Sequence, residues 1–264
     1  MNGLVDAGDV RTAIVTGASA GLGRAIAISL GALGWSVALG ARRVEQLAET
    51  AQLVTEAGGT PFGHALDVSS PESIDAFLES TTDALGPVDV LVNNAGVAAP
   101  GLMHEMLDDD HARIIATNLL GPILLTKRVV ADLRRRGAPG DVVFISSDTT
   151  VNPRAYLGTY GVSKSGLEAF ATTLALECED FPIRSSIVRI GSTVSGFAEG
   201  WDLEMFAEII PRWQRFGVQR HFDQLQPEDV ARAVVNVVTA PAHVWTRIVE
   251  VQPQPPTADE PTAE

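Results

Sequence analysis

Short hydrophobic segments alternate with segments of helical periodicity along almost the whole chain. The hydrophobic segments are rich in β-branched residues and apolar on both faces, which is typical of strands that helices cover on two sides. They lie at residues 11–16, 35–41, 61–66, 88–92, 141–146, 183–189 and 244–251. The amphipathic segments lie at residues 22–34, 43–57, 71–85, 107–136, 159–180 and 227–239. This alternation predicts an α/β fold, a single doubly wound domain whose parallel sheet has about seven strands and helices on both faces.

Several predicted helices carry their own start and stop signals. Ser70 is a good N-cap, followed by a proline at the first helical position and by an acid in the first turn. The segment 107–136 begins with three aspartates and ends with three arginines before Gly137, which matches the helix dipole at both ends. The pair Gly121-Pro122 inside this segment predicts a local disturbance of the helix.

The chain length fits one domain followed by a short tail. Its 264 residues suit a single α/β domain over residues 1–251. Residues 252–264 are rich in proline and acidic side chains, so we expect a disordered tail there.

Charge and composition narrow the class of partner. The chain has 33 acidic and 19 basic side chains, a formal net charge of −14, which argues against nucleic acid and anionic membranes. We find no leader peptide and no run of the roughly 18 apolar residues that a membrane span needs. Cys178 is the only cysteine, which excludes an intrachain disulfide and fits a cytoplasmic protein. The five histidines show no ligand spacing, so no metal is predicted.

A glycine-rich turn, Thr16–Gly23, follows the first predicted strand and opens the first predicted helix. Glycines there allow a tight turn and let a pyrophosphate approach the backbone at the helix N-terminus. Polar or small residues also end the second, third and fourth strands, at the edge of the sheet where such folds bind ligands. The cofactor-binding residues expected at this edge are Gly17, Ser19, Gly21, Leu22, Gly23, Arg42, Arg43, Asp67, Val68, Asn94, Ala95 and Gly96.

The end of the second strand indicates which nucleotide is preferred. An acidic residue at that position would accept the ribose hydroxyls of NAD, but the chain has Ala41 there, followed by Arg42 and Arg43. Two guanidinium groups suit a 2′-phosphate, so NADP(H) is favoured and NAD(H) stays possible. Alternatively, the two arginines only solvate the start of a helix.

The same turn also fits a different chemistry. Residues Gly17 to Gly21 match the G-x-S-x-G elbow of serine hydrolases, with Ser19 as nucleophile. Its position on the first strand, and the absence of an obvious pairing between a histidine and an acid in the sequence, argue against this alternative.

Tyr160 and Lys164 are the best candidates for acid–base chemistry. Their i, i+4 spacing puts them on one face of a helix, in a chain with only two tyrosines and two lysines. A neighbouring ammonium favours tyrosinate and can lower the tyrosine pKa from its ordinary value near 10. Ser147, at the end of the fifth strand, could hydrogen-bond a substrate oxygen. Asn118 could hold a water molecule between Lys164 and solvent.

Together these residues resemble the short-chain dehydrogenase/reductase family, in its branch of single-domain enzymes of roughly 250 residues. The family motifs TGxxxGxG, NNAG and YxxxK match Thr16–Gly23, Asn93–Gly96 and Tyr160–Lys164, and the resemblance spans residues 10–251. It implies a Rossmann-type domain that interconverts a carbonyl and an alcohol with NADP(H).

The resemblance also implies roles for individual residues. Tyr160 would protonate the carbonyl oxygen, Lys164 would bind the nicotinamide ribose, and Ser147 would orient the carbonyl. Asn118 would hold the relay water. Gly191 and Ser195 would lie at the nicotinamide, although the usual proline before this glycine is Ile190 here.

Substrate and assembly are the least determined by sequence. The aromatic segment 196–225 is expected to form a lid in which Phe197 and Trp201 contact an apolar ketone or aldehyde, with subunit contact or core packing as the alternative. Leu203, Phe206, Ala207 and Ile210 share one helical face of this segment. The resemblance implies a dimer or tetramer through helices 107–136 and 159–180. A protein that senses NADP(H) without turnover is a further alternative.

Overall fold

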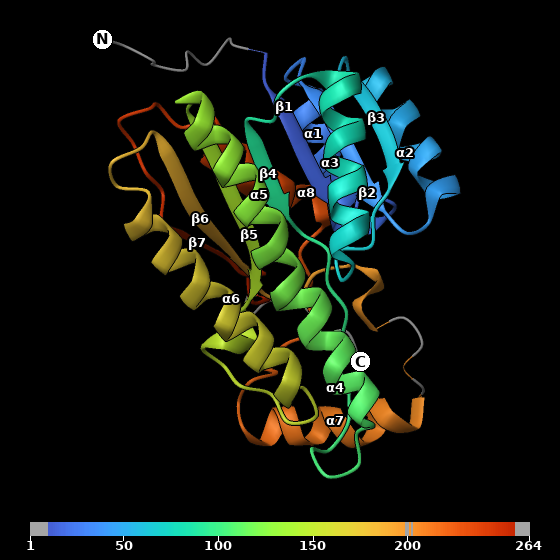
Figure 1. Ribbon diagram of the computed structural model, residues 1–264. Coiled ribbons are helices and arrows are strands. Elements are labelled where there is room, and N and C mark those ends of the chain that lie inside the picture. Colours follow the sequence, from blue (N-terminus) through green and yellow to red (C-terminus); the bar gives the residue numbers. More distant parts are fainter. Residues whose placement is uncertain (1–9, 199–200, 202, 257–264) are drawn as a thin grey trace.

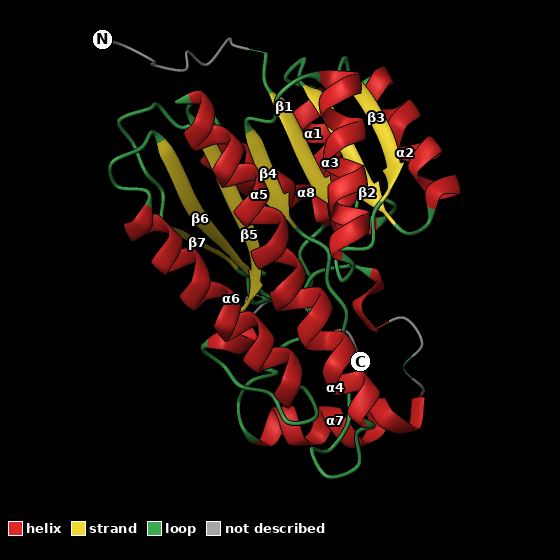
Figure 2. Ribbon diagram, in the orientation of Figure 1, coloured by secondary structure: helices red, strands yellow, loops and turns green. Residues whose placement is uncertain are grey.

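The residues described by the computed structural model are 10–198, 201 and 203–256, and they form a seven-stranded parallel sheet. The strands are β1 (Thr12–Thr16), β2 (Ser36–Ala41), β3 (Thr60–Ala65), β4 (Val90–Asn93), β5 (Gly140–Ser147), β6 (Ile183–Ile190) and β7 (Ile248–Val251). Their order in the sheet is β3-β2-β1-β4-β5-β6-β7 (Figure 2). The chain reverses its winding direction between β1 and β4, and such switch points are where α/β sheets bind ligands.

Helices cover both faces of this sheet. They are α1 (Gly21–Gly31), α2 (Val44–Glu56), α3 (Pro71–Leu85), α4 (Asp108–Ile115), α5 (Gly121–Arg136), α6 (Gly158–Glu177), α7 (Leu203–Arg215) and α8 (Pro227–Val238). Helices α3, α5 and α6 lie in front of the sheet in Figure 1, and α1 and α8 lie behind it. Helix α7 lies beyond the ends of the strands (Figure 1). The predicted fold class is confirmed.

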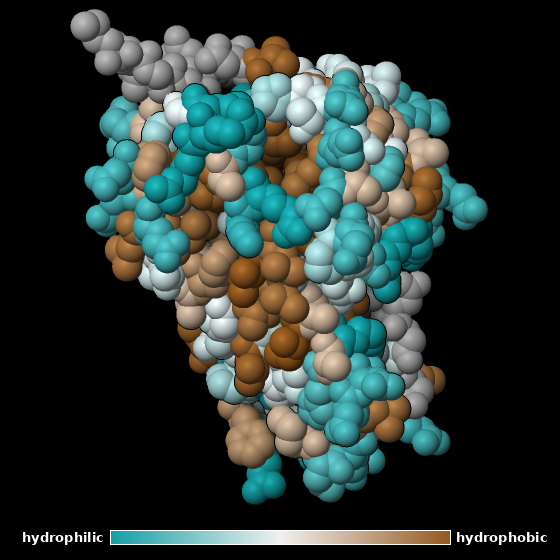
Figure 3. All heavy atoms as spheres, viewed as in Figure 1, coloured by the Kyte–Doolittle hydropathy of each residue, from teal (hydrophilic) through white to brown (hydrophobic). Residues whose placement is uncertain are grey.

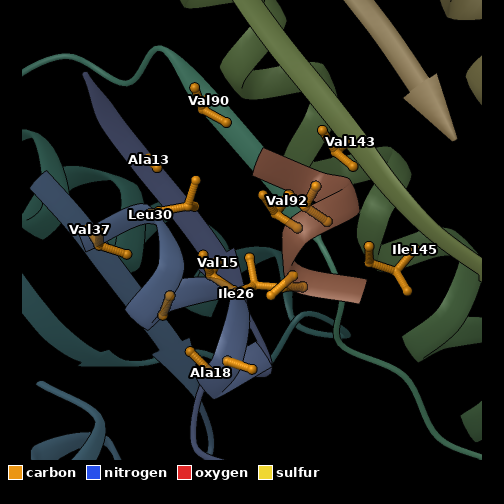
Figure 4. Packing of buried hydrophobic residues seen from close by; sticks show 14 of the residues in the cluster. Ala13, Val15, Ala18, Ile26, Leu30, Val37, Val90, Val92, Val143 and Ile145 are labelled. Carbon is orange, nitrogen blue, oxygen red and sulfur yellow. The ribbon is translucent and has the colours of Figure 1, made fainter. Parts of the chain in front are cut away.

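Successive residues of the central strands point to opposite faces of the sheet and pack into two separate hydrophobic cores. Val15 and Val92 point to the face covered by α1 and α8, where they pack with Ile26 and Leu30 (Figure 4). Their neighbour Ile14 points to the opposite face, under α3 and α5. Because both faces of the central strands β1, β4 and β5 are buried, these strands are mostly apolar, which explains their hydrophobic segments in the sequence.

Two helix-end signals of the sequence, at Ser70 and Gly137, are found in the structure, whereas α1 ends at Gly31 and α6 at Glu177, three residues earlier than predicted. The hydroxyl oxygen of Ser70 accepts a hydrogen bond from the Ser73 N–H at 3.1 Å and so caps α3. Gly137 adopts a left-handed conformation with φ 64° and ends α5. The last strand is shorter than predicted: of residues 244–251 only Ile248–Val251 are strand, because Trp245 instead donates its indole N–H to the Ser185 carbonyl.

The long segment that begins at Asp108 is one continuous helical rod but not one regular α-helix. Five residues, Ala116–Leu120, form a π-helical turn between α4 and α5, directly before the predicted disturbance. By length and composition alone, Asp108–Arg136 is the one helical stretch among the described residues that could cross a membrane. Leu125 and Leu133, however, are fully buried against the sheet, so the stretch is a core helix of this fold.

Candidate active site

The turn between β1 and α1 is shaped by its glycines. Gly17 has a left-handed backbone with φ 69°, and its N–H donates to the Gly40 carbonyl at the end of β2, 2.7 Å away. A Cβ on Gly23 would lie 2.3 Å from the Gly17 carbonyl oxygen, so a larger residue does not fit. Gly21, with φ 51°, begins α1. The backbone of the turn can therefore approach a phosphate at the N-terminus of α1.

The loop after β4 is fastened to the same turn. The hydroxyl oxygen of Thr16 accepts hydrogen bonds from the N–H groups of Asn94 at 3.0 Å and Ala95 at 2.9 Å. The side-chain amide of Asn94 donates back to the Thr16 carbonyl at 2.8 Å. Further along the loop, a Cβ on Gly96 would lie 3.7 Å from Nζ of Lys164. The loop thus connects the glycine turn with the tyrosine–lysine pair of α6.

Ser19 is buried in the turn beside two arginines. Its carbonyl accepts a hydrogen bond from Arg24 at 2.8 Å, and its hydroxyl oxygen accepts one from Arg43 at 3.3 Å. A serine hydrolase would need a histidine base at this hydroxyl, and an arginine occupies that place. The hydrolase alternative therefore has no support in the geometry. Leu22 packs against the core beneath α1.

The residues that follow β2 and β3 lie near each other, because these two parallel strands are neighbours in the sheet. Arg42 is exposed, whereas Asp67 is half-buried. A hydrogen bond from the Ser69 hydroxyl, and the nearby charge of Arg42, hold the pKa of Asp67 below its ordinary value. Val68 is buried, and a Cβ on Gly121 would lie 2.5 Å from its carbonyl oxygen, so Gly121 allows the helical rod to approach this loop closely.

Helix α6 presents Tyr160 and Lys164 one turn apart, as their spacing predicts. Tyr160 is 8% exposed, and the Ser147 side chain at the end of β5 lies close enough to lower the pKa of its phenol. Nζ of Lys164 donates to the Ile145 carbonyl at 2.9 Å and lies 5.9 Å from the centre of the Tyr160 ring. The three side chains that the sequence assigned to catalysis at β5 and α6 therefore lie together.

Burial dominates the protonation of this pair. It raises the pKa of Tyr160 to about 12, although the hydrogen bond with Ser147 opposes the rise. Burial also lowers the pKa of Lys164 to about 8, an effect that the negative charge of Glu168 partly offsets. The sequence predicts that Lys164 lowers the pKa of Tyr160, but burial of the phenol disfavours its charged form and has the larger effect on this pKa. Tyr160 therefore holds its proton at neutral pH.

Asn118 lies in the π-helical turn and is completely buried. Its Oδ1 accepts a hydrogen bond from the Val97 N–H, and its Nδ2 donates to the Val97 carbonyl, both at 2.8 Å. Nδ2 also donates to the Ser163 hydroxyl oxygen at 3.1 Å. With both amide hydrogens used, only the second lone pair of Oδ1 can bind a water molecule. The side chain thus fixes the loop after β4 against α6.

A cavity of about 450 Å³ opens beside Tyr160 and Ser147. Its walls come from the end of β6, from the segment before α7 and from α7 itself, and include Phe206, Ile210, Trp213 and Phe222. Phe197 meets the Tyr160 ring edge-on at a centroid distance of 5.0 Å, and Trp201 lies 5.5 Å beyond Phe197. The candidate proton donor therefore faces a chamber in which aromatic side chains lie beside polar ones.

A model of the short chain dehydrogenase family matches residues 11–204, which hold the glycine turn, Ser147, Tyr160 and Lys164. This chain belongs to the short-chain dehydrogenase family. The match includes the chamber walls up to Trp201 and leaves out the lining residues from Phe206 to Gln224. The part of the chamber formed by α7 and the segment after it therefore lies outside the matched residues.

Known proteins resemble this dehydrogenase over most of its length. It is 32% identical to glycine betaine reductase ATRR of Emericella nidulans over 92% of this chain, which spans only 19% of that protein. It is 34% identical to 3beta-hydroxysteroid dehydrogenase 1 of Eggerthella lenta over 69% of this chain and 70% of the relative.

A solved structure agrees with these relatives. The alcohol dehydrogenase of the archaeon Thermococcus sibiricus, complexed with 5-hydroxy-NADP, is 29% identical, with a TM-score of 0.79. The likeness covers 94% of this chain and 100% of that one. Our chain is accordingly an oxidoreductase that acts on CH–OH and C=O groups with a nicotinamide cofactor.

The residues of this dehydrogenase fit such a cofactor. A Cβ on Gly23 would collide with the Gly17 carbonyl oxygen, and a Cβ on Gly17 would press against the loop after β4. Only glycines at these two positions leave the turn open as a cradle. Gly96 keeps the corresponding space clear in front of Lys164. Gly191, after β6, is closely approached by the side chain of Gln252, whose position a Cβ on Gly191 would overlap.

Gln252 is also the first residue of the predicted tail. The structure describes this tail only to residue 256, and residues 257–264 lie outside the described part.

The predicted apolar face of α7 is found only in part. Phe206 and Ile210 line the chamber, whereas Leu203 is 87% exposed and Ala207 is exposed as well. Ile209, which is fully buried, and Trp213, which is 8% exposed, lie on the buried side of the helix instead. The indole N–H of Trp213 donates to the Ala155 carbonyl at 2.9 Å, so α7 packs on the loop before α6 as well as on the chamber.

The lid segment is closed at its base. Thr193 and Leu225 form a parallel β-bridge, in which the Val194 N–H donates to the Leu225 carbonyl at 2.9 Å. Ser195, the residue expected at the nicotinamide, accepts a hydrogen bond from the Phe197 N–H at 3.3 Å. Both ends of the lid therefore leave the sheet from one point beside Gly191.

A half-buried acid behind Lys164 was not predicted from the sequence. Glu168 lies one helical turn further along α6 and accepts hydrogen bonds from Ser146 at 2.7 Å, Thr150 at 3.1 Å and Arg189 at 2.7 Å. Its i+4 spacing from Lys164 was the available signal. The ion pair formed by Asp148 and Arg154 was not predicted either.

Proposed function

We propose that this dehydrogenase reduces an apolar ketone or aldehyde to the alcohol with NADPH, and that Tyr160 is its proton donor. The observation that carries the proposal is the position of Tyr160. The phenol is buried, holds its proton at neutral pH, and lines the chamber together with Ser147. A protonated phenol suits reduction, because reduction requires an acid at the carbonyl oxygen.

Each of the four candidate catalytic residues has a separate role in the transfer of the proton to the carbonyl oxygen of the substrate. Tyr160 gives its phenolic proton to the carbonyl oxygen, and Ser147 donates a hydrogen bond to the same atom as negative charge develops there. Lys164 binds the nicotinamide ribose and stabilises the tyrosinate that forms. Asn118 holds the neighbouring loop in place. The reduced nicotinamide, when bound, supplies the hydride.

The preference for NADP(H) rests on the end of β2. Arg42 is exposed beside the turn, and Arg43 already reaches over it to Ser19. We expect Arg42→Ala to weaken NADPH binding about tenfold or more and NADH binding much less, because a charged hydrogen bond to the 2′-phosphate is lost. Titrations that follow nicotinamide fluorescence measure both affinities.

The control for this prediction is Arg232→Ala, which removes an exposed arginine of α8. It should leave both affinities unchanged. Equal affinity of the wild type for NADPH and NADH, or an Arg42→Ala variant that keeps the NADPH preference, would overturn the assignment of the 2′-phosphate site.

The proposed substrate class follows from the chamber walls. Four aromatic side chains form a row from Tyr160 through Phe197 and Trp201 to Phe206, with successive centroid distances of 5.0, 5.5 and 5.5 Å. Such a row offers apolar area to a bulky substrate. Comparable turnover of small hydrophilic carbonyls by the wild type and by Trp201→Ala would contradict this choice.

Exposed apolar residues on the helical rod and α6 support an oligomer. Leu107, Leu120, Val162 and Leu176 are 47–69% exposed, and Figure 3 shows hydrophobic residues gathered on the face where α5 and α6 lie. Patches of this kind mark protein contacts. Light scattering should give at least twice the 27.9 kDa chain mass, and Val162→Asp should lower it.

Val44→Asp, which places the same charge on α2, is the matched control and should leave the mass unchanged. A wild-type mass equal to one chain would contradict the oligomer. We also infer a cytoplasmic location from the single, buried Cys178.

A further inference from the structure

A buried ion pair follows the serine of the active site directly. Asp148 is the residue after Ser147, and its two carboxylate oxygens accept hydrogen bonds from Nη1 and Nη2 of Arg154 at 2.5 and 2.8 Å. Only 10% of the arginine side chain and 9% of the aspartate side chain are exposed. A two-point contact of this kind fixes the orientation of both groups.

The pair is in direct contact with the catalytic groups. The hydroxyl of Ser147 lies 3.5 Å from Oδ1 of Asp148 and accepts a hydrogen bond from the Thr149 N–H at 3.2 Å. Both members of the pair line the chamber with Tyr160. The Arg154 guanidinium also lies over the Trp213 ring, 5.6 Å from its centre, and so touches the lid helix.

The two charges act on the phenol with opposite signs. After burial, which raises the pKa of Tyr160, and the Ser147 hydrogen bond, which lowers it, Asp148 raises the pKa and Arg154 lowers it. The remaining cation near the ring within the described residues is Lys164.

Charged groups on the neighbouring elements α6, β6 and α7 are paired with one another or with Tyr156, and not with Tyr160. Glu168 of α6 is paired with Arg189 of β6. On α7, Arg212 donates to the Tyr156 hydroxyl at 2.6 Å, and that hydroxyl donates to Glu208 at 2.7 Å. The charges that face Tyr160 across the chamber are therefore those of the pair.

We propose that Asp148 and Arg154 form a charge-neutral positioning pair, in which Arg154 cancels the negative charge that Asp148, beside the Ser147 hydroxyl, would otherwise present to the tyrosinate. The inference rests on the proposed role of Tyr160 as proton donor. Neither residue is catalytic, because both act through Ser147 and Tyr160. The pair keeps an aspartate beside the serine without opposing the charge that reduction creates on the phenol.

The ionisation of Tyr160 can be measured without a substrate. Tyr156 and Tyr160 are the only tyrosines of the chain, so the difference between a protein and its Tyr160→Phe counterpart isolates the tyrosinate absorbance of Tyr160. The titration uses the full chain saturated with NADP⁺. Failure of NADP⁺ to bind is seen before the titration and counts against the proposed cofactor, not against the pair.

The two single variants are expected to shift the pH of the Tyr160 transition in opposite directions, and the double variant is expected to leave it nearly unchanged. Arg154→Gln leaves Asp148 uncompensated and moves the Tyr160 transition to higher pH by about one unit. Asp148→Asn leaves Arg154 uncompensated and moves the transition to lower pH by a similar amount. In the double variant both charges are gone, and the transition returns close to the wild-type position.

The same transition in all four proteins would overturn the proposal and leave the pair a purely structural link. Should Arg154→Gln fail to fold, the downward shift in Asp148→Asn and its absence in the double variant still decide the matter. If the absorbance transition moves but the pH profile of alcohol oxidation does not follow it, then Tyr160 is not the proton-transfer group. That outcome overturns the proposed function and, with it, the role assigned to the pair.

Discussion

Tyr160→Phe lowers kcat/KM for carbonyl reduction by roughly a hundred- to ten-thousandfold and leaves NADPH binding nearly unchanged. The substitution removes the proton donor and the partner of Ser147 but keeps the ring that packs edge-on against Phe197. Steady-state kinetics on any carbonyl that the wild type reduces measures the first effect. Nicotinamide fluorescence measures the second.

Tyr156→Phe is the matched control, because it removes the other phenolic hydroxyl of the chain. That hydroxyl binds Glu208 and Arg212 at the lid helix and is not bonded to Ser147. We expect the control to retain most of the activity. Activity of Tyr160→Phe within about tenfold of the wild type, below the usual range for a lost general acid, would refute the assigned proton donor. Loss of cofactor binding in Tyr160→Phe would instead show that the residue is needed for the fold of the site.

Gly23→Ala abolishes measurable cofactor binding and destabilises the fold by about 1–3 kcal/mol. The added Cβ would lie 2.3 Å from the Gly17 carbonyl oxygen and 2.6 Å from Nδ2 of Asn94. One contact is with backbone and the other is with the side chain that ties the β4 loop to the turn, so the turn must open to accept the methyl group. Urea unfolding and NADPH titration report the two effects separately.

Gly63→Ala, on the edge strand β3, makes the same chemical change where space allows it. Its added Cβ would meet Cβ of Leu47 at 3.4 Å, an ordinary contact. Stability and NADPH affinity should both stay close to the wild type. If Gly23→Ala binds NADPH like this control, the glycine turn is not the phosphate cradle.

The fold could be predicted because its signals are local. The central strands β1, β4 and β5 are buried on both faces and are therefore mostly apolar, and the amphipathic helices carry a stripe that shows in their own periodicity. The cap at Ser70 and the left-handed Gly137 depend on neighbours within a few residues. The same holds for Tyr160 and Lys164, which one helical turn brings together.

The parts that escaped prediction depend on partners distant in sequence or on irregular backbone. Asp148 and Arg154 meet because the loop between them turns back, and no periodicity describes that loop. Glu168 meets Arg189 from a neighbouring strand. The hydrogen bond from Trp213 to the Ala155 carbonyl helps determine which face of α7 is buried. This carbonyl is a backbone group, so no pattern of side chains predicts the contact.

The closed base of the segment 196–225 has a consequence for its proposed role in substrate choice. Because Thr193 and Leu225 are bridged, the chain between them leaves and re-enters the domain at a single point. Changes of length or sequence within such an excursion cost little loop-closure entropy and need not disturb the sheet. Under the proposed function, such changes would alter the molecules accepted and leave the residues of hydride and proton transfer in place.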